Sequence, residues 1–107
     1  MLFRSVTTIS VLITIHLPGA QSLKEKRAVV RSLVARLRSR LDLTAAEVGA
    51  QDMLQRAEVG FAIVSEATAT ARRLTDEARR FIDLELLGRA EVVATEVEET
   101  VLQPRYR

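Results

Sequence analysis

The residues of this 107-residue chain best suited to chemistry are cations that recur along one segment. Placed on a helix at 100° per residue, Lys24, Arg27, Arg31 and Arg38 fall within an arc of about 60°. Guanidinium and ammonium groups in such a row bind phosphate oxygens through charged hydrogen bonds and release counterions. Lys26, in the first turn of the same segment, is a fifth candidate. The spacing predicts contacts with a nucleic-acid backbone.

The same row has a plainer interpretation as a solvated helix face with no partner. Residues 22–41 carry seven cations and one anion, Glu25, whereas exposed helices usually mix the two signs. Residues 81–99 carry six anions and one cation, so the net charge of +2 conceals a dipole. Lys26 falls on the apolar side of its helix, where a lysine stem commonly extends along the core. The scarcity of acids favours phosphate binding without excluding a solvated face.

A second candidate site is the loop that leads into this helix. His16, Gln21 and Ser22 lie next to the helix start, where free N–H groups and the helix dipole favour a small anion. The spacing of Ser22 and Glu25 is also that of a capping box, which would use those N–H groups internally. A lone histidine at a strand end is more often a structural hydrogen-bonding group, so both interpretations stay open.

Composition argues against catalysis and metal binding. The chain has no cysteine and one histidine, which excludes disulfides, thiol catalysis, cysteine-ligated metals and a histidine pair. Glu47 and Asp52 could form an acid–base pair, but neither a nucleophile nor a metal shell accompanies them, and Asp52 is better interpreted as a loop cap. We therefore expect no enzyme, no catalytic residue, no cofactor and no metal.

Hydrophobic periodicity predicts the elements that position these residues. Apolar residues alternate from Ile9 to Leu17, which is typical of a half-buried strand and unlike the solid apolar core of a secretory signal. A helix is expected from the Ser22 cap to Leu41. The further elements expected are strands at 44–48, 58–64 and 90–97, a helical turn within 50–56, and a helix at 68–87 ended by Gly88.

The resulting order, βαββαβ, predicts an α+β ferredoxin-like fold. A four-stranded antiparallel sheet should carry both helices on one face, with the first and third strands central because they are the most apolar. We expect one domain at 6–99, with flexible termini at 1–5 and 100–107. No apolar stretch reaches about 18 residues, so we expect a cytoplasmic protein without a membrane span.

The sheet face away from the helices is the third candidate surface. Leu12, Gly60, Ala62 and Val64 should lie on it and make it small-sided and partly apolar, as in a dimer interface. Base stacking on this face is not expected, because Phe61 and Phe81 are assigned to the core. Any nucleic acid would therefore be held through its phosphates.

Several segments together resemble the YlxP-like family, a small bacterial family of unknown function. They are HLPGAQSLKEKR at 16–27, VRSL at 30–33, AEV at 46–48, QD at 51–52, QRA at 55–57 and VS at 64–65. The resemblance covers about residues 9–98 and implies a ferredoxin-like fold. Family genes commonly lie beside those for translation initiation factor two and ribosome-binding factor A, which implies a role near translation. The family often has Trp where Leu54 stands, and it has no established catalytic residues to transfer.

These observations predict a non-enzymatic protein that binds ribosomal RNA or a ribosomal subunit through its first helix. The alternative is a regulatory module that forms a homodimer through the open sheet face and binds a small ligand there.

Overall fold

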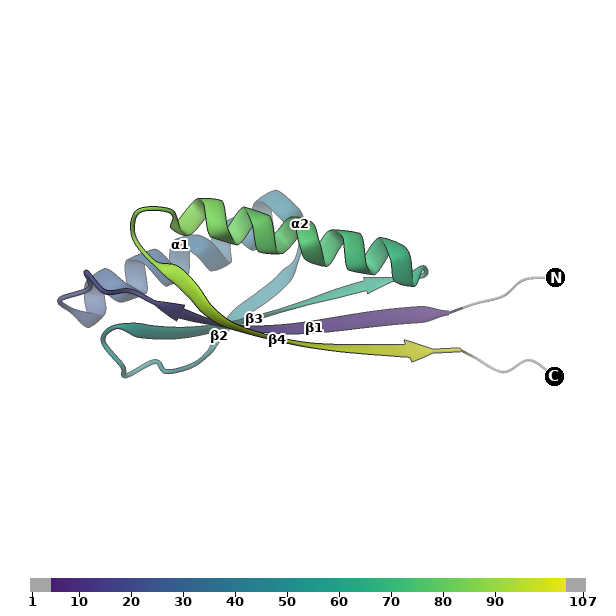
Figure 1. The fold of residues 1–107 in the computed structure, drawn as a ribbon, viewed down its shortest axis with the longest axis horizontal. Helices are drawn as coiled ribbons and strands as arrows, with labels where there is room; N and C mark the ends of the chain where they lie inside the picture. The colour runs from purple at the N-terminus through teal and green to yellow at the C-terminus, as the bar shows by residue number, and fades with distance from the viewer. Residues whose placement is uncertain (1–4, 104–107) are drawn as a thin grey trace.

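The chain folds with the predicted order of strands and helices. The computed structural model describes residues 5–103. Its elements are β1 (Val6–His16), α1 (Leu23–Leu41), β2 (Thr44–Gly49), β3 (Arg56–Ser65), α2 (Thr68–Leu86) and β4 (Glu91–Leu102) (Figure 1). The predicted βαββαβ arrangement is therefore confirmed. Residues 1–4 and 104–107, predicted to belong to flexible termini, lie outside the described residues.

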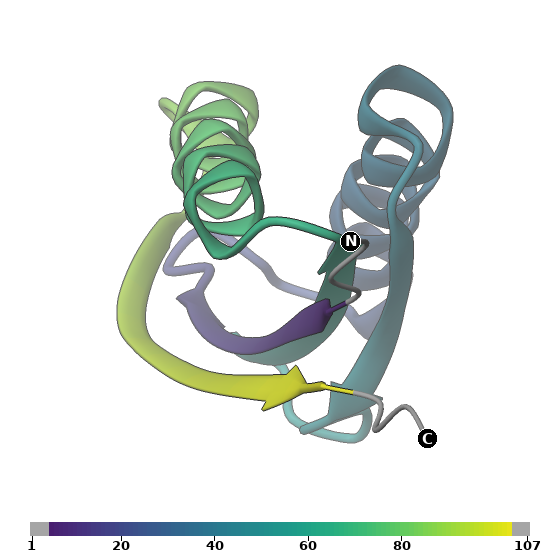
Figure 2. The ribbon, with the colours of Figure 1, turned by 90° about the vertical axis from the view of Figure 1, so that its right-hand side faces the viewer.

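The four strands form one antiparallel sheet in the order β2-β3-β1-β4. As predicted, the two most apolar strands, β1 and β3, occupy the centre. Both helices cover the same face of the sheet and stand over it as two separate ridges, with β2 running alongside α1 (Figure 2). Within residues 5–103 neither helix covers the opposite face, and most of its side chains are partly or fully exposed.

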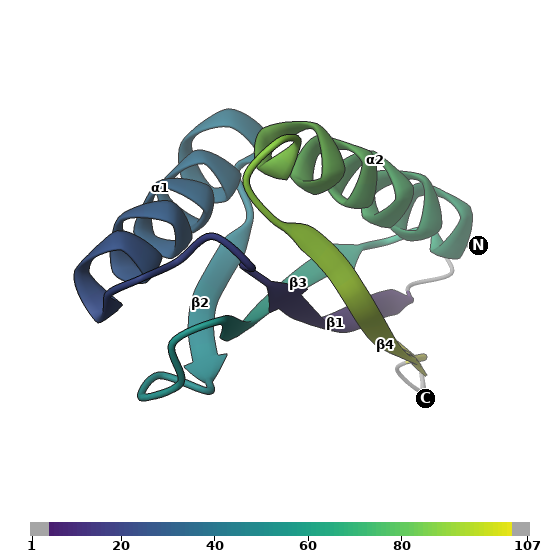
Figure 3. The ribbon, with the colours of Figure 1, turned by 60° about the vertical axis from the view of Figure 1, so that its left-hand side comes forward.

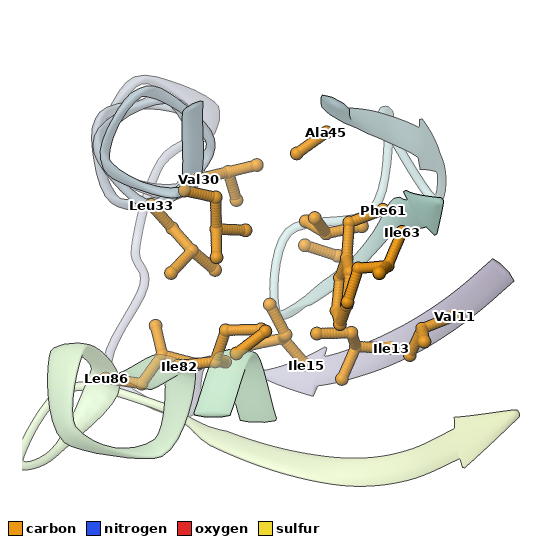
Figure 4. Packing of buried hydrophobic residues seen from close by; sticks show 14 of the residues in the cluster. Val11, Ile13, Ile15, Val30, Leu33, Ala45, Phe61, Ile63, Ile82 and Leu86 are labelled. Carbon is orange, nitrogen blue, oxygen red and sulfur yellow. The ribbon is translucent and has the colours of Figure 1, made fainter. Parts of the chain in front are cut away.

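The core lies between the sheet and the two helices. Alternate residues of the central strands, such as Ile13 and Phe61, point toward it because successive strand side chains project to opposite faces. Val30 and Leu33 of α1 and Ile82 and Leu86 of α2 close it from above (Figure 4). The apolar side of α1 is buried along a stripe that includes Val30, Leu33 and Leu37. Neither helix within residues 5–103 has both the length and the apolar character needed to cross a bilayer.

The last strand is longer than predicted. It was expected to end at residue 97 and the domain at 99, yet β4 continues to Leu102. The reason is the early start of β1, whose Val6 pairs with Leu102 and whose Thr8 pairs with Thr100. Ser5, assigned to a flexible terminus, donates a hydrogen bond from Oγ to the Glu66 carbonyl at 2.7 Å.

The connections follow the expected caps, with one correction. Gly88, predicted to end the second helix, has φ of +83°, and the N–H groups of the next two residues donate to the Leu86 carbonyl. The helical turn predicted within residues 50–56 is wrong. These residues form tight turns instead, with Ala50 at φ of 57° and Met53 N donating to Ala50 O at 3.1 Å. The loop takes this path because its carbonyls are bound by a buried side chain, described next.

Candidate nucleic-acid interface

The four predicted phosphate-binding cations lie together on one flank of α1, here called the basic flank (Lys24, Arg27, Arg31 and Arg38). All four side chains are exposed. The helix lies beside β2 (Figure 3). The Nε of Arg38 donates to the Ala45 carbonyl of β2 at 3.0 Å, so the flank borders that strand. Among the described residues, no carboxylate lies within 4.0 Å of the charged nitrogens of this flank. The flank is therefore a positive surface whose cations form no ion pair in the described part of the chain, although Glu47 of β2 borders the same hollow as Arg31 and Arg38.

Lys26 does not belong to this surface, and its prediction as a phosphate contact is wrong. Its side chain is fully buried. Its Nζ donates to the carbonyls of Ala50 at 2.6 Å, Arg56 at 3.1 Å and Gln51 at 3.2 Å. An ammonium group has three N–H donors, so these bonds use all of them. Lys26 instead anchors the β2–β3 loop to α1.

The position of Lys26 explains why it turns inward. On a helical projection it lies between Leu33 and Leu37, at the centre of the buried stripe. Its aliphatic stem is buried there and carries the ammonium to the carbonyls of the β2–β3 loop. The stripe position was visible in the sequence, but the three carbonyls come from a loop 24 to 30 residues away.

The carboxylate of Glu47 accompanies this buried ammonium. Its Oε2 lies 3.9 Å from Lys26 Nζ and has no hydrogen-bond partner within the described residues. Glu47 is thus engaged on the helix side of the sheet, while Asp52 is exposed on the loop. Residues 5–103 contain no group of three His, Asp or Glu side chains that could hold a metal ion. The geometry adds no nucleophile or metal shell to the Glu47–Asp52 candidate.

Two arginines outside the basic flank are neutralised where elements meet. On the opposite flank of α1, Arg36 Nη1 donates to both carboxylate oxygens of Glu85, at 3.0 and 3.3 Å, and so links α1 to α2. Arg72 on α2 forms two hydrogen bonds to Glu99 on β4, at 2.8 and 2.9 Å. These hydrogen bonds lower the pKa of the Glu99 carboxyl and raise the pKa of Arg72. Part of the predicted acidic C-terminal region is therefore paired.

The loop before α1 is occupied by the helix's own cap. Ser22 Oγ accepts from Glu25 N at 3.1 Å, which confirms the predicted serine cap. Glu25 Oε2 reaches back as expected but accepts from Gln21 N at 2.7 Å, one residue before the N–H that a capping box uses. An incoming anion would face the Glu25 carboxylate. His16 Nδ1 lies 3.8 Å from Glu91 Oε1 on the neighbouring strand. Anion binding by His16, Gln21 and Ser22 stays a prediction that this cap opposes.

The sheet face away from the helices carries the four predicted dimer residues. Leu12, Gly60, Ala62 and Val64 lie on it by register, and Val64 is 67% exposed. Its hollow of about 540 Å³ includes Leu12, Gly60 and Val48, with Glu96 and Glu98 at the side. Carboxylates on this face repel both a phosphate backbone and a second copy of the same face. Dimerisation remains a prediction.

Comparison with solved structures supports the fold. A de novo designed protein with a ferredoxin fold is similar with a TM-score of 0.53 and 13% identity, over 88% of this chain and 83% of that one. A C-terminal segment of the alpha subunit of aIF2 from Pyrococcus abyssi has the same TM-score at 14% identity, over 95% of this chain and 52% of that one. At such identities the likeness establishes the ferredoxin-like fold alone.

Comparison at the level of sequence identifies the family. The Uncharacterized protein YlxP of Bacillus subtilis (strain 168) is 36% identical over 64 residues, which are 60% of this chain and 70% of that protein. Residues 8–97 match the family described as Protein of unknown function (DUF503). This range includes all the segments that resembled the YlxP-like family, and it confirms that prediction. The chain therefore belongs to the DUF503 family of proteins.

Proposed function

We propose that this protein is a non-enzymatic cytoplasmic protein that binds ribosomal RNA through the basic flank of α1. The observation that carries the proposal is that four exposed cations share one flank of a helix, and none of them has a carboxylate within 4.0 Å in the described part of the chain. Arg79 and Arg80 of α2 also lack such a partner, but acidic residues lie among the cations of that helix, at positions 76, 77 and 83. Unneutralised cations in a row are the electrostatic footprint of a phosphate-binding surface.

The arrangement of charge also selects which side of the molecule meets the RNA. The sheet face that RNA-recognition folds use for base stacking carries Glu58, Glu96 and Glu98 here. A polyanion would be repelled from that face and attracted to the basic flank, on the β2 side of α1. The role near translation that the family resemblance implies agrees with an RNA partner.

The proposal has a quantitative test in the salt dependence of binding. Four phosphate contacts give a slope of log affinity against log salt of about −3.6. Affinity for ribosomal RNA should therefore fall about 150-fold between about 50 and 200 mM salt. In the variant Arg27→Gln/Arg31→Gln the slope should decline to about −1.8, and the loss over the same range to about 12-fold. Filter binding measures both.

The matched control is Arg79→Gln/Arg80→Gln, which removes the same charge from two exposed arginines of α2. If affinity depends only on net charge, the two double variants will behave alike and the basic flank is not the site. Absence of binding to ribosomal RNA by the unaltered protein at low salt refutes the proposed function itself. Co-sedimentation with the small ribosomal subunit at low salt extends the same test to the native particle.

A further inference from the structure

The described surface offers no platform on which unpaired bases could stack. Phe61 is 4% exposed and Phe81 packs against the core, and these are the aromatic residues within 5–103. Proteins that bind single-stranded RNA depend on aromatic side chains that stack with successive bases. The surface beside the basic flank therefore lacks the feature that makes single strands bind.

The basic flank is straight and rigid. At 1.5 Å rise per residue, Lys24, Arg27 and Arg31 follow one another at intervals of about 4.5 and 6 Å, and Arg38 lies about 10.5 Å further along. The row thus spans about 21 Å of a continuous helix. Arg38 is held at its far end by the hydrogen bond to Ala45 O. A rigid row of this length is complementary to a rigid array of phosphates.

A base-paired stem supplies such an array. A duplex carries the phosphates of both strands, so its charge density along the axis is about twice that of one of its strands; in B-form DNA it is about one charge per 1.7 Å, or about 12 charges over 21 Å. An A-form RNA stem likewise carries two strands of phosphates. Double-stranded RNA is recognised mainly by its shape and its phosphates, which needs no aromatic residue. A flexible single strand would also have to lose conformational entropy to follow the row.

We infer that the ligand of the basic flank is the sugar–phosphate backbone of a base-paired RNA stem. This inference rests on the proposed function and specifies the form of RNA that is bound. The stem lies along α1 on its β2 side, with Lys24, Arg27, Arg31 and Arg38 each contacting phosphate. The protein makes no base-specific contacts with the stem, so stems of different sequence bind with similar affinity.

The test compares an RNA duplex of about 16 base pairs with an oligouridine strand of the same number of phosphates, by fluorescence anisotropy. The duplex should bind at least about tenfold more tightly at low salt, with a salt slope near −3.6, against about −2.8 for a strand contacted at four phosphates. A second duplex of scrambled sequence should bind within about threefold of the first. Arg27→Gln/Arg31→Gln should weaken duplex binding, and Arg79→Gln/Arg80→Gln should leave it nearly unchanged.

Three outcomes separate this inference from the function on which it rests. Tighter or equal binding of oligouridine overturns the stem and leaves RNA binding by the flank intact, provided that Arg27→Gln/Arg31→Gln weakens it. A strong preference between the two duplexes overturns backbone recognition. Failure of every RNA to bind overturns the proposed function as well.

Discussion

Replacement of Lys26 by Met would test whether this residue is a structural anchor. Methionine retains an unbranched apolar stem and removes the ammonium, so packing along the buried stripe is largely preserved. The change leaves the carbonyls of Ala50, Gln51 and Arg56 without their donor and the Glu47 carboxylate without its nearest cation. The variant therefore isolates the polar contribution of one side chain.

The expected loss of unfolding free energy is about 3–5 kcal/mol, the range for removing one partner of a buried charged cluster. The sum of three separate hydrogen bonds from a charged donor, at about 1.5–3 kcal/mol each, would be a larger loss than this range. Residues 51 and 56 are exposed, so water can reach part of the released backbone and the lower range applies. Domains of this size have total stabilities of about 5–15 kcal/mol, so the loss is a large fraction.

Urea denaturation followed by circular dichroism measures this loss. Lys24→Met is the matched control, because it makes the same replacement at an exposed position two residues earlier and should cost less than about 0.5 kcal/mol. Hydrogen exchange should rise at residues 50–56 in the Lys26 variant. Where the folded state persists, its RNA salt slope should equal that of the unaltered protein, because Lys26 contacts no phosphate. A stability within about 1 kcal/mol of the unaltered protein would refute the anchor.

Two further predictions concern single contacts at the ends of elements. Because hydrogen bonds from Arg72 lower the pKa of Glu99, this pair stabilises the fold above the ordinary carboxyl pKa of about 4.3 and loses that contribution as pH falls through the lowered value. Arg72→Gln should therefore reduce the loss of stability between neutral pH and pH about 3, as urea midpoints would show, and an unchanged pH profile contradicts it. Ser22→Ala removes the oxygen that accepts from Glu25 N and should cost about 1 kcal/mol in urea unfolding, whereas an unchanged urea midpoint would refute a stabilising role of this cap.

Much of the fold was predictable because its signals are local. Alternation from Ile9 to Leu17 marks a strand whatever it pairs with, and the Ser22–Glu25 box marks a helix start by bonds three and four residues apart. Gly88 marks the end of α2 because a positive φ is accessible to glycine at little steric cost. The same locality predicted the basic flank, since its residues share one helix and differ only in angle around its axis.

The candidate site was predicted less completely, and Lys26 shows why. The positive charge of Lys26 and its neighbours Lys24 and Arg27 favoured phosphate binding. Its angular position around the helix axis, in contrast, favoured burial in the core. A buried lysine is stable only if polar partners meet its ammonium, and those partners were not identifiable along the helix. The loop that provides them was itself predicted as a helical turn. The wrong prediction for the loop and the wrong prediction for Lys26 therefore have one cause: the contact between them joins segments that are far apart in the sequence.

By itself, the sequence determined the order of the elements, the faces that they bury, the start of α1 at Ser22, the end of α2 at Gly88 and the cations that share a flank. Each of these depends on residues a few positions apart, where covalent geometry sets which side chains are neighbours. Only the tertiary structure decided that Lys26 is enclosed by three carbonyls 24 to 30 residues away and that β4 extends to Leu102 opposite Val6. It also decided that Arg36 and Arg72 are neutralised while Arg27 and Arg31 are not. These outcomes depend on which distant segments meet, because a charge is satisfied by what packs against it in space.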